Sequence, residues 1–116
     1  MALIRFETNA NVPEDRMKIV ITNLTRAVSR VTGEPETEIR VEIAGNRRMR
    51  MADSDEPIAH IEIRDVEIPK ERAKEITQAI CPVIEDAMDI EDRNIYIAIV
   101  SRRNSMWRVN GDAKLQ

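Results

Sequence analysis

The 116-residue chain contains one internal repeat, whose two copies are 56 residues apart. The letters PEDRMK at residues 13–18 return as PKERAK at 69–74, and EIRVEI at 38–43 returns as NIYIAI at 94–99. Between these landmarks both copies carry apolar residues at the three- and four-residue spacing of an amphipathic helix. A constant offset across several patterns indicates one structural unit encoded twice.

Alternating apolar residues flank each predicted helix, at 4–8 and 39–43 in the first copy and at 61–63 and 95–99 in the second. Such alternation predicts strands with one buried face. Each copy is therefore predicted to be a β-α-β unit with parallel strands and a right-handed crossover. We predict an α/β fold in which two units form a four-stranded mixed sheet with both helices on one face. The single domain would span 1–116, with repeats at about 2–50 and 57–103 and a C-terminal segment at 104–116.

The two predicted helices differ at one position. Both have a proline and acidic residues at their start, and the first ends at Thr32 and Gly33 followed by Pro35, which are common boundary signals. The second contains Pro82 in its interior, where proline removes a hydrogen bond and clashes with the preceding turn at a cost of about 3 kcal/mol. We expect a kink near residues 78–82, or a helix that restarts there.

Charge and cysteine content narrow the function classes. A net charge of −3 argues against a nucleic-acid partner, because phosphate binding needs a positive surface. Arg5 and Glu7 interrupt the only apolar stretch near the start, and no run is long enough for a transmembrane helix, so neither a signal peptide nor a membrane partner is expected. Cys81 is the single cysteine, which suits a reducing compartment, so we predict a cytoplasmic protein. Beside the apolar stripe of the second helix, Cys81 is expected to be a small buried hydrophobe.

The strand residues between the apolar positions are mostly charged. They predict a polar sheet face made of Arg5, Glu7, Arg40, Glu42, His60, Glu62, Arg64, Tyr96, Ala98 and Val100. Two interpretations are open: a solvated face with cross-strand ion pairs, or the lining of a polar channel in an oligomer. His60 has no second ligand near it in the sequence, so no metal site is expected, and hydrogen bonding within the sheet is the simpler role.

In order and spacing, five segments of the chain resemble a known family. They are MALIRFETN at 1–9, TGEPE at 32–36, EPIAHIEI at 56–63, EDRNIYI at 91–97 and MWRVNG at 106–111. Together with the repeated β-α-β unit, they resemble the tautomerase superfamily, and within it the macrophage migration inhibitory factor branch. The resemblance implies a homotrimer with a site at each subunit interface. It also implies keto–enol tautomerisation of compounds such as phenylpyruvate or dopachrome, without a cofactor.

The resemblance also implies which positions form the site. The family's catalyst is an N-terminal proline whose amine transfers a proton, and the matching residue here is Ala2. The family's lysine matches Glu34, its pocket asparagine matches Ala98, and its aromatic residue before NG matches Val109. The positions that agree with the family are Tyr96, the backbone at Val66, and Asn110-Gly111. The substitutions together indicate a site that is no longer maintained for the family's reaction.

Arginines offer a possible replacement for the lost positive charge. Arg103 and Arg108 follow the last predicted strand, and Arg47 is the repeat partner of Arg103. Guanidinium groups bind carboxylates and phosphates well, so these residues could bind a small anionic ligand. The alternative is a pair of solvated loops balanced by nearby acidic residues.

Two functions are therefore carried forward. The first is a trimeric binding or interaction protein that has kept the scaffold and lost the chemistry. The second is a weak or altered tautomerase that uses the amine of Ala2, exposed by removal of Met1, together with Tyr96. A primary α-amino group, with an ordinary pKa of about 7.7–8.0, can act as a base or form a Schiff base.

Overall fold

The computed structural model describes residues 2–66, 68–101, 106–109 and 112–115, and the side chains of 2–66 and 68–100. The helices are α1 (Glu14–Thr32) and α2 (Ala73–Met88), and the short 3-10 turns are η1 (Glu36–Glu38), η2 (Lys70–Arg72) and η3 (Asp92–Asn94). The strands are β1 (Leu3–Thr8), β2 (Arg40–Ala44), β3 (Ala59–Val66), β4 (Ile95–Ser101), β5 (Met106–Val109) and β6 (Asp112–Leu115).

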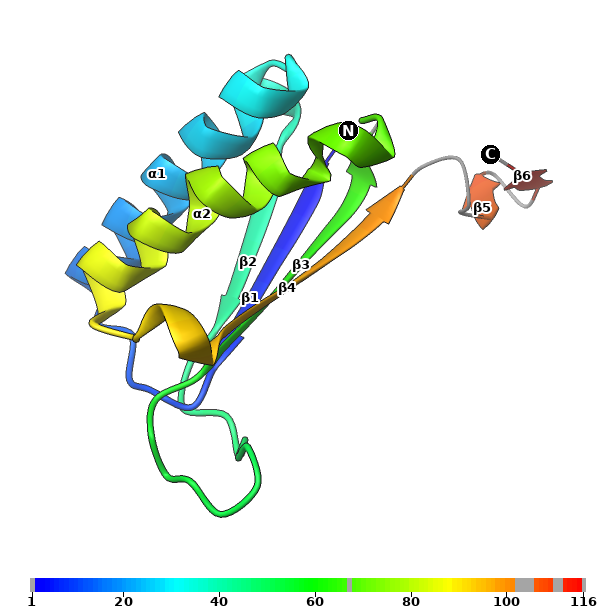
Figure 1. Cartoon of the computed structure of the whole chain (residues 1–116). Helices are drawn as coiled ribbons and strands as arrows, with labels where there is room; N and C mark the ends of the chain where they lie inside the picture. Colours follow the sequence, from blue (N-terminus) through cyan, green and yellow to red (C-terminus); the bar gives the residue numbers. More distant parts are fainter. Residues whose placement is uncertain (1, 67, 102–105, 110–111, 116) are drawn as a thin grey trace.

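The four long strands form one mixed sheet in the order β2-β1-β3-β4, with both helices on one face (Figure 1). Strand β1 is parallel to β2 and β3 is parallel to β4, while β1 and β3 are antiparallel. Each repeat is therefore a β-α-β unit, and the units meet along β1 and β3. The predicted fold is confirmed. Strands β5 and β6 form a separate antiparallel pair that the sequence did not predict.

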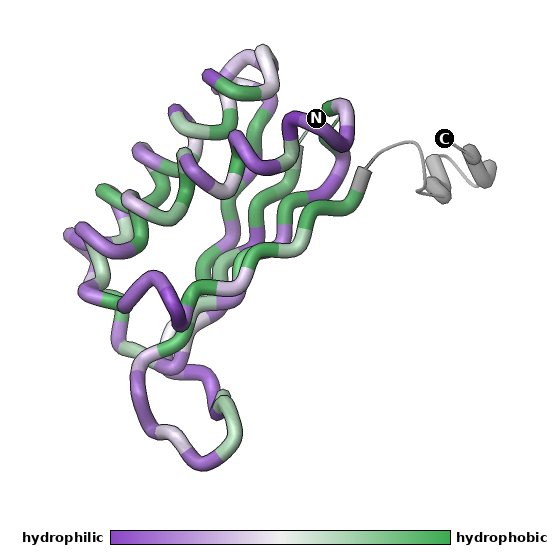
Figure 2. Tube along the Cα trace, in the orientation of Figure 1, coloured by the Kyte–Doolittle hydropathy of each residue, from purple (hydrophilic) through white to green (hydrophobic). Residues whose placement is uncertain are grey.

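The core lies between the sheet and the helices and is aliphatic except for Phe6. Along the central strands, alternate residues have no exposed surface, and Figure 2 shows the matching alternation of hydrophobic and hydrophilic residues. These fully buried strand residues include Ile4, Phe6, Ile61 and Ile63. The helices contribute Val20, Leu24, Val28, Ile76, Ile80 and Ile84. The helical stripe predicted for each repeat thus supplies the second layer of the core.

Helix α2 runs from Ala73 to Met88 without a break, so the expected restart at Pro82 does not occur. Ile76, Ile80 and Ile84 lie on the buried side of this helix and are fully covered. Burial of one such side chain contributes about 1.5–3 kcal/mol, so three of them outweigh the roughly 3 kcal/mol cost of one proline. Packing against the sheet therefore holds the helix together through the proline.

Candidate functional site

Residue 2 lies at the end of the sheet where β3 and β4 finish (Figure 1). Ala2 has no exposed surface and belongs to the core. Its carbonyl oxygen accepts a hydrogen bond of 3.0 Å from the backbone N–H of Arg40, at the start of β2. The next residue, Leu3, pairs with Arg40 on one side and with Arg64 of β3 on the other. The backbone that carries the candidate amine is therefore held between two neighbouring strands.

Glu34 follows the end of α1, in the segment that leads to β2. Gly33 closes the helix with a left-handed φ of 79° and donates its N–H to the carbonyl of Ser29 at 2.8 Å. The Ser29 hydroxyl donates to the Glu34 carbonyl at 2.6 Å, and the Glu34 N–H donates to the Thr32 hydroxyl oxygen at 3.2 Å. The local turn thus positions a partly buried acidic side chain where the family resemblance implies a lysine.

Val66 closes β3 and has no exposed surface. Between Arg64 and Val66 the register of β3 with β4 shifts, and the residue within this irregularity is Asp65. Asp65 has a left-handed φ of 67° and is only 7% exposed. Sequence reasoning did not select Asp65, because strand alternation alone gives no sign of a register shift. Two successive charged residues, Arg64 and Asp65, before the apolar Val66 were the available signal, because they interrupt the alternation of the strand.

Tyr96 and Ala98 lie on β4, far from residue 2 of the same chain. Tyr96 pairs with His60 and Ala98 with Glu62, whereas Val66 pairs with Ser101 at the other end of the strands. Val66 is six positions after His60 along β3, which corresponds to about 20 Å at roughly 3.3 Å per residue. One chain therefore does not bring Tyr96 to Ala2, and a site that contains both requires a second copy of the chain.

The arginine-rich loop after β2 is largely balanced by acidic groups. Arg47 lies 3.9 Å from a carboxylate oxygen of Glu7, and Arg50 lies 3.3 Å from Asp55. Among the predicted anion-binding residues, Arg103 lies outside the described part of the chain. Arg108 and Val109 are described only as backbone within β5. An anionic ligand at Arg103 and Arg108 stays a prediction.

The predicted polar face of the sheet carries cross-strand and same-strand ion pairs. Arg5 and Glu42, on neighbouring strands, are 3.3 Å apart. Arg64 donates a hydrogen bond to Glu62, and this bond is the main reason that the pKa of Glu62 is lowered. Arg5, Glu7, Glu42 and Arg47 also line a shallow hollow of about 290 Å³.

Cys81 is partly buried, where a small buried hydrophobe was expected. Burial, and to a lesser extent a hydrogen bond to Asp92, together raise the pKa of its thiol to about 11. The thiol is therefore protonated at neutral pH and is a weak nucleophile. Within the described residues no group of His, Cys, Asp and Glu side chains is arranged to hold a metal ion. None of the described helices is both long and apolar enough to span a bilayer.

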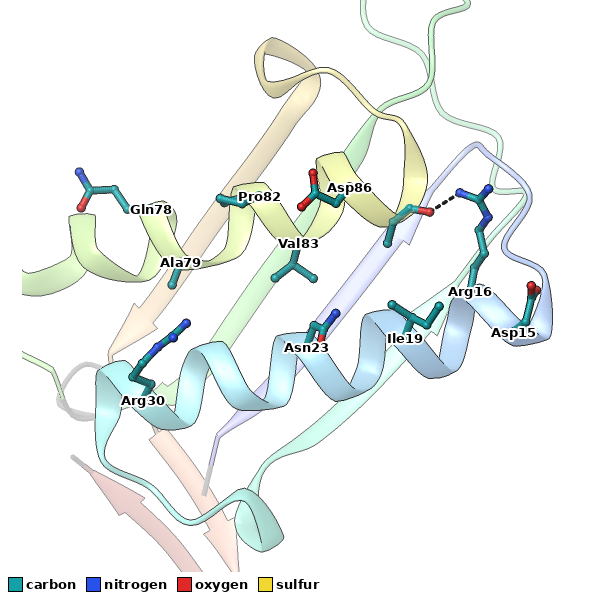
Figure 3. A pocket seen from close by; sticks show the side chains of 11 residues that line it. Asp15, Arg16, Ile19, Asn23, Arg30, Gln78, Ala79, Pro82, Val83 and Asp86 are labelled. Carbon is teal, nitrogen blue, oxygen red and sulfur yellow. Dashed lines mark hydrogen bonds between the residues drawn. The ribbon is translucent and has the colours of Figure 1, made fainter.

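A larger concavity, of about 610 Å³, lies between α1 and α2 (Figure 3). Ile19 on α1 is half exposed in it, and Val83 of α2 points toward α1 from the other side. Arg16 donates a hydrogen bond across the groove to the carbonyl of Ala87. Charged groups at both ends include Arg30 and Asp15. Of the residues that the family resemblance assigns to the site, those whose side chains are described do not line this groove.

The repeated β-α-β sheet, with a buried residue 2 at its end, defines the architecture of the tautomerase superfamily. The family model described as macrophage migration inhibitory factor (MIF) matches residues 1–113. The chain belongs to the MIF family. A comparison with curated proteins found no significant match.

Solved structures of this family have the same fold at low sequence identity. MIF2 of Leishmania major is 16% identical with a TM-score of 0.83, covering 98% of this chain and 97% of its own. The MIF-like protein of Entamoeba histolytica is 18% identical with a TM-score of 0.82, covering 97% and 98%. The Prochlorococcus marinus homologue is 22% identical with a TM-score of 0.80, covering 96% and 97%. At these identities the comparison shows the shared fold alone.

Proposed function

We propose that the protein is a MIF-like homotrimer whose tautomerase site is degenerate and serves binding rather than catalysis. The observation that carries the proposal is that the buried, strand-anchored position 2 holds alanine. The family resemblance implies a proline there, whose secondary amine is the proton-transfer group. A primary amine in its place removes the ring that fixes the nitrogen and changes its basicity.

Two further substitutions support this interpretation. Glu34 presents a carboxylate where a lysine would bind the anionic end of a keto acid, so the Coulomb interaction with that substrate changes sign. Ala98, exposed on β4, has no side-chain donor to polarise a carbonyl oxygen. Such electrostatic and hydrogen-bonding groups supply a large part of transition-state stabilisation in enzymes. Their combined loss favours binding without turnover.

The trimer and the place of action belong to the same proposal. Tyr96 and Ala2 lie at opposite ends of the sheet, so a family-type site can be assembled only from neighbouring chains. We place the protein in the cytoplasm, where a lone cysteine such as Cys81 stays reduced. No cofactor is required for the proposed role.

A phenylpyruvate keto–enol assay tests the proposal directly. The protein is first analysed by intact mass, so that only chains with Met1 removed are assayed. We expect no rate above that of buffer for the native sequence. The triple variant Ala2→Pro, Glu34→Lys, Ala98→Asn is the matched positive control, because it restores the three groups together and should gain activity. Clear turnover by the native sequence would contradict the binding role.

A weak tautomerase is the alternative, and one observation favours it. Ala2 is fully buried and its carbonyl is tied to β2, so an amine at residue 2 would be held in a fixed position. If this alternative holds, the native sequence is active, activity is lost when Met1 is retained, and Tyr96→Phe lowers kcat. Ala2→Pro alone should then increase the rate.

A further inference from the structure

Two arginines at equivalent positions of the repeats connect α1 and α2 at both ends. Arg16, in the first turn of α1, donates a hydrogen bond to the carbonyl of Ala87 in the last turn of α2 (Figure 3). Arg72, immediately before α2, donates to the carbonyl of Val31 in the last turn of α1 at 3.0 Å. The two donors are 56 residues apart, and so are the two acceptors. Each arginine thus satisfies a carbonyl group that the end of the other helix leaves unpaired.

The concavity of about 610 Å³ between α1 and α2, named here the helix groove, lies between these two contacts. Asn23 and Ala79, which are also equivalent in the two repeats, line its central part. The short side chain of Ala79 fills little of the space between the helices (Figure 3). Because the helices are tied at both ends, the groove is already formed in the single chain, and a ligand would not have to open it.

The helix groove exposes apolar side chains at positions where the two repeats differ. Ile19 is 51% exposed, the highest value among the large hydrophobic side chains that the structure describes, and its equivalent in the second repeat is Glu75. Conversely, α2 presents the exposed Pro82 where the first repeat has Arg26. Val83 also lines the groove and points toward α1. Exposed apolar groups that gather in one concavity are typical of an interaction surface.

Charged side chains of opposite sign lie at the two ends of the helix groove. Asp15 and Asp86 lie at the end where Arg16 contacts α2, and Arg30 lies toward the other end (Figure 3). None of Asp15, Asp86 and Arg30 is in an ion pair with another side chain in the described ranges. Two carboxylates outnumber the single guanidinium group at the first end. A partner therefore meets net negative charge at one end and positive charge at the other.

The secondary structure around the groove favours a helical partner. Every described residue that lines the groove belongs to α1 or α2. An extended peptide would find no strand edge there to pair with its backbone N–H and C=O groups. A helix satisfies these groups internally and can place an apolar stripe in a groove. From Arg16 to Val31, α1 is about 22 Å long at roughly 1.5 Å per residue, which matches a partner helix of about four turns.

We propose that the helix groove is a docking site for an amphipathic helix of a partner protein. The apolar stripe of the partner helix covers Ile19 and the neighbouring side chains of α2. A basic residue near one end of that helix meets Asp15 and Asp86, and an acidic residue near the other end meets Arg30. None of the groove residues belongs to the sheet, so the inference does not depend on the chemistry of residue 2.

A synthetic peptide of about 15 residues tests the docking site, with binding followed by the fluorescence anisotropy of an attached dye. Leucines at three- and four-residue spacing form its apolar stripe, one lysine and one glutamate lie at opposite ends, and alanine and glutamine fill the other positions. We expect the native protein to bind this peptide with a Kd in the micromolar range. Ile19→Gln should weaken binding about fivefold, because it removes apolar area from the contact. Absence of binding by the native protein would overturn the proposal.

Thr22→Gln is the matched control, because it introduces the same residue at an exposed position of α1 that does not line the groove. Its affinity for the peptide should stay within about twofold of the native value. Both variants should keep the native urea midpoint, since both side chains are exposed on the helix. Equal weakening by Ile19→Gln and Thr22→Gln would contradict binding in the groove.

Arg30→Glu tests the charge complementarity and leaves the apolar surface intact. In a second peptide, lysine replaces the glutamate, so both ends are basic and the direction of the bound helix does not affect the comparison. The native protein should bind the first peptide several-fold more tightly than the second, and Arg30→Glu should reverse this preference. The same preference in both proteins would overturn the proposed docking mode.

A second copy of the chain is the competing occupant of the groove, and light scattering at increasing protein concentration distinguishes it from a partner helix. We expect the native protein and Ile19→Gln to have the same mass at every concentration. If the native mass doubles at high concentration and Ile19→Gln abolishes the doubling, the groove serves self-association and the proposal of a partner helix is overturned.

Discussion

Gly33 ends α1 in a conformation that side chains with a Cβ atom rarely adopt, with φ at 79°. A Cβ atom added there would meet nothing within 4 Å, so the cost of Gly33→Ala is conformational rather than steric. We expect a loss of about 1 kcal/mol in the free energy of unfolding, measured by urea denaturation. Gly33→Asn should lose less, because asparagine tolerates this region. Equal stability of Gly33→Ala and the native protein would contradict the assignment of a conformational cap.

The alternation of apolar residues along the strands predicted the burial of some side chains and did not predict that of others. The alternation of Ile4, Phe6, Ile61 and Ile63 correctly predicted which side chains are buried, because a regular strand exposes every second residue. The same rule could not identify Asp65, whose burial follows from a register shift in β3. Such a shift depends on tertiary contacts, and local periodicity does not record it.

At the level of elements, α2 contains an unfavourable residue that its packing tolerates. Pro82 is exposed and cannot donate a hydrogen bond to the carbonyl of Gln78, one turn earlier. Pro82→Ala restores this donor, so we expect the free energy of unfolding to rise by about 1–3 kcal/mol in urea denaturation. Asp86→Ala, an exposed substitution in the next turn, is the control and should change stability by less than about 0.5 kcal/mol. A Pro82→Ala protein less stable than the native one would show that the proline is required for packing.

The C-terminal end of α2 carries a second unfavourable interaction. Partial burial and the nearby charge of Asp92 raise the pKa of Glu85 in the folded protein. A carboxyl group with a raised folded-state pKa binds its proton more tightly when folded, so its ionisation destabilises the fold as the pH rises through that pKa. Glu85→Gln should therefore shift the urea midpoint upward at pH 7. Below about pH 4.3, where the group is protonated in both states, the shift should vanish. A shift of equal size at both pH values would point to a cause other than ionisation.

The sequence was less informative about short elements than about long ones. Helices α1 and α2 were predicted because their apolar stripes extend over many residues. The structure confirms both helices, and the residues that are buried in each belong largely to these stripes. The three 3-10 turns and the strands β5 and β6 were not predicted, because segments of three or four residues have no periodicity to detect. For the site, the roles assigned to Ala2, Glu34 and Val66 stay predictions. The sequence could not show that Tyr96 lies at the far end of the sheet, since that depends on strand order.

For the whole molecule, the internal repeat was the strongest predictor. The constant offset predicted two equivalent β-α-β units within one sheet. In the structure these units meet through their first strands, β1 and β3, which pair with each other. This arrangement leaves β2 and β4 as edges of the sheet. Each edge presents unpaired backbone groups, which proteins cover or pair with another chain. The topology of one chain thus provides surfaces on which further copies can assemble.

Assembly is the prediction that belongs to this scale. Ala2 and Tyr96 are at opposite ends of the sheet, so a family-type site forms only if the start of β1 in one chain meets the start of β4 in another. Light scattering coupled to size exclusion should give three times the chain mass of 13.3 kDa. A proline at Ala98, in the middle of edge strand β4, should reduce pairing along that edge and shift the population toward monomer. Ala98→Ser is the matched control, because it keeps the backbone donor at the same position. A native protein that is monomeric at all concentrations would rule out a shared site, and with it both the trimeric binding scaffold and the tautomerase alternative.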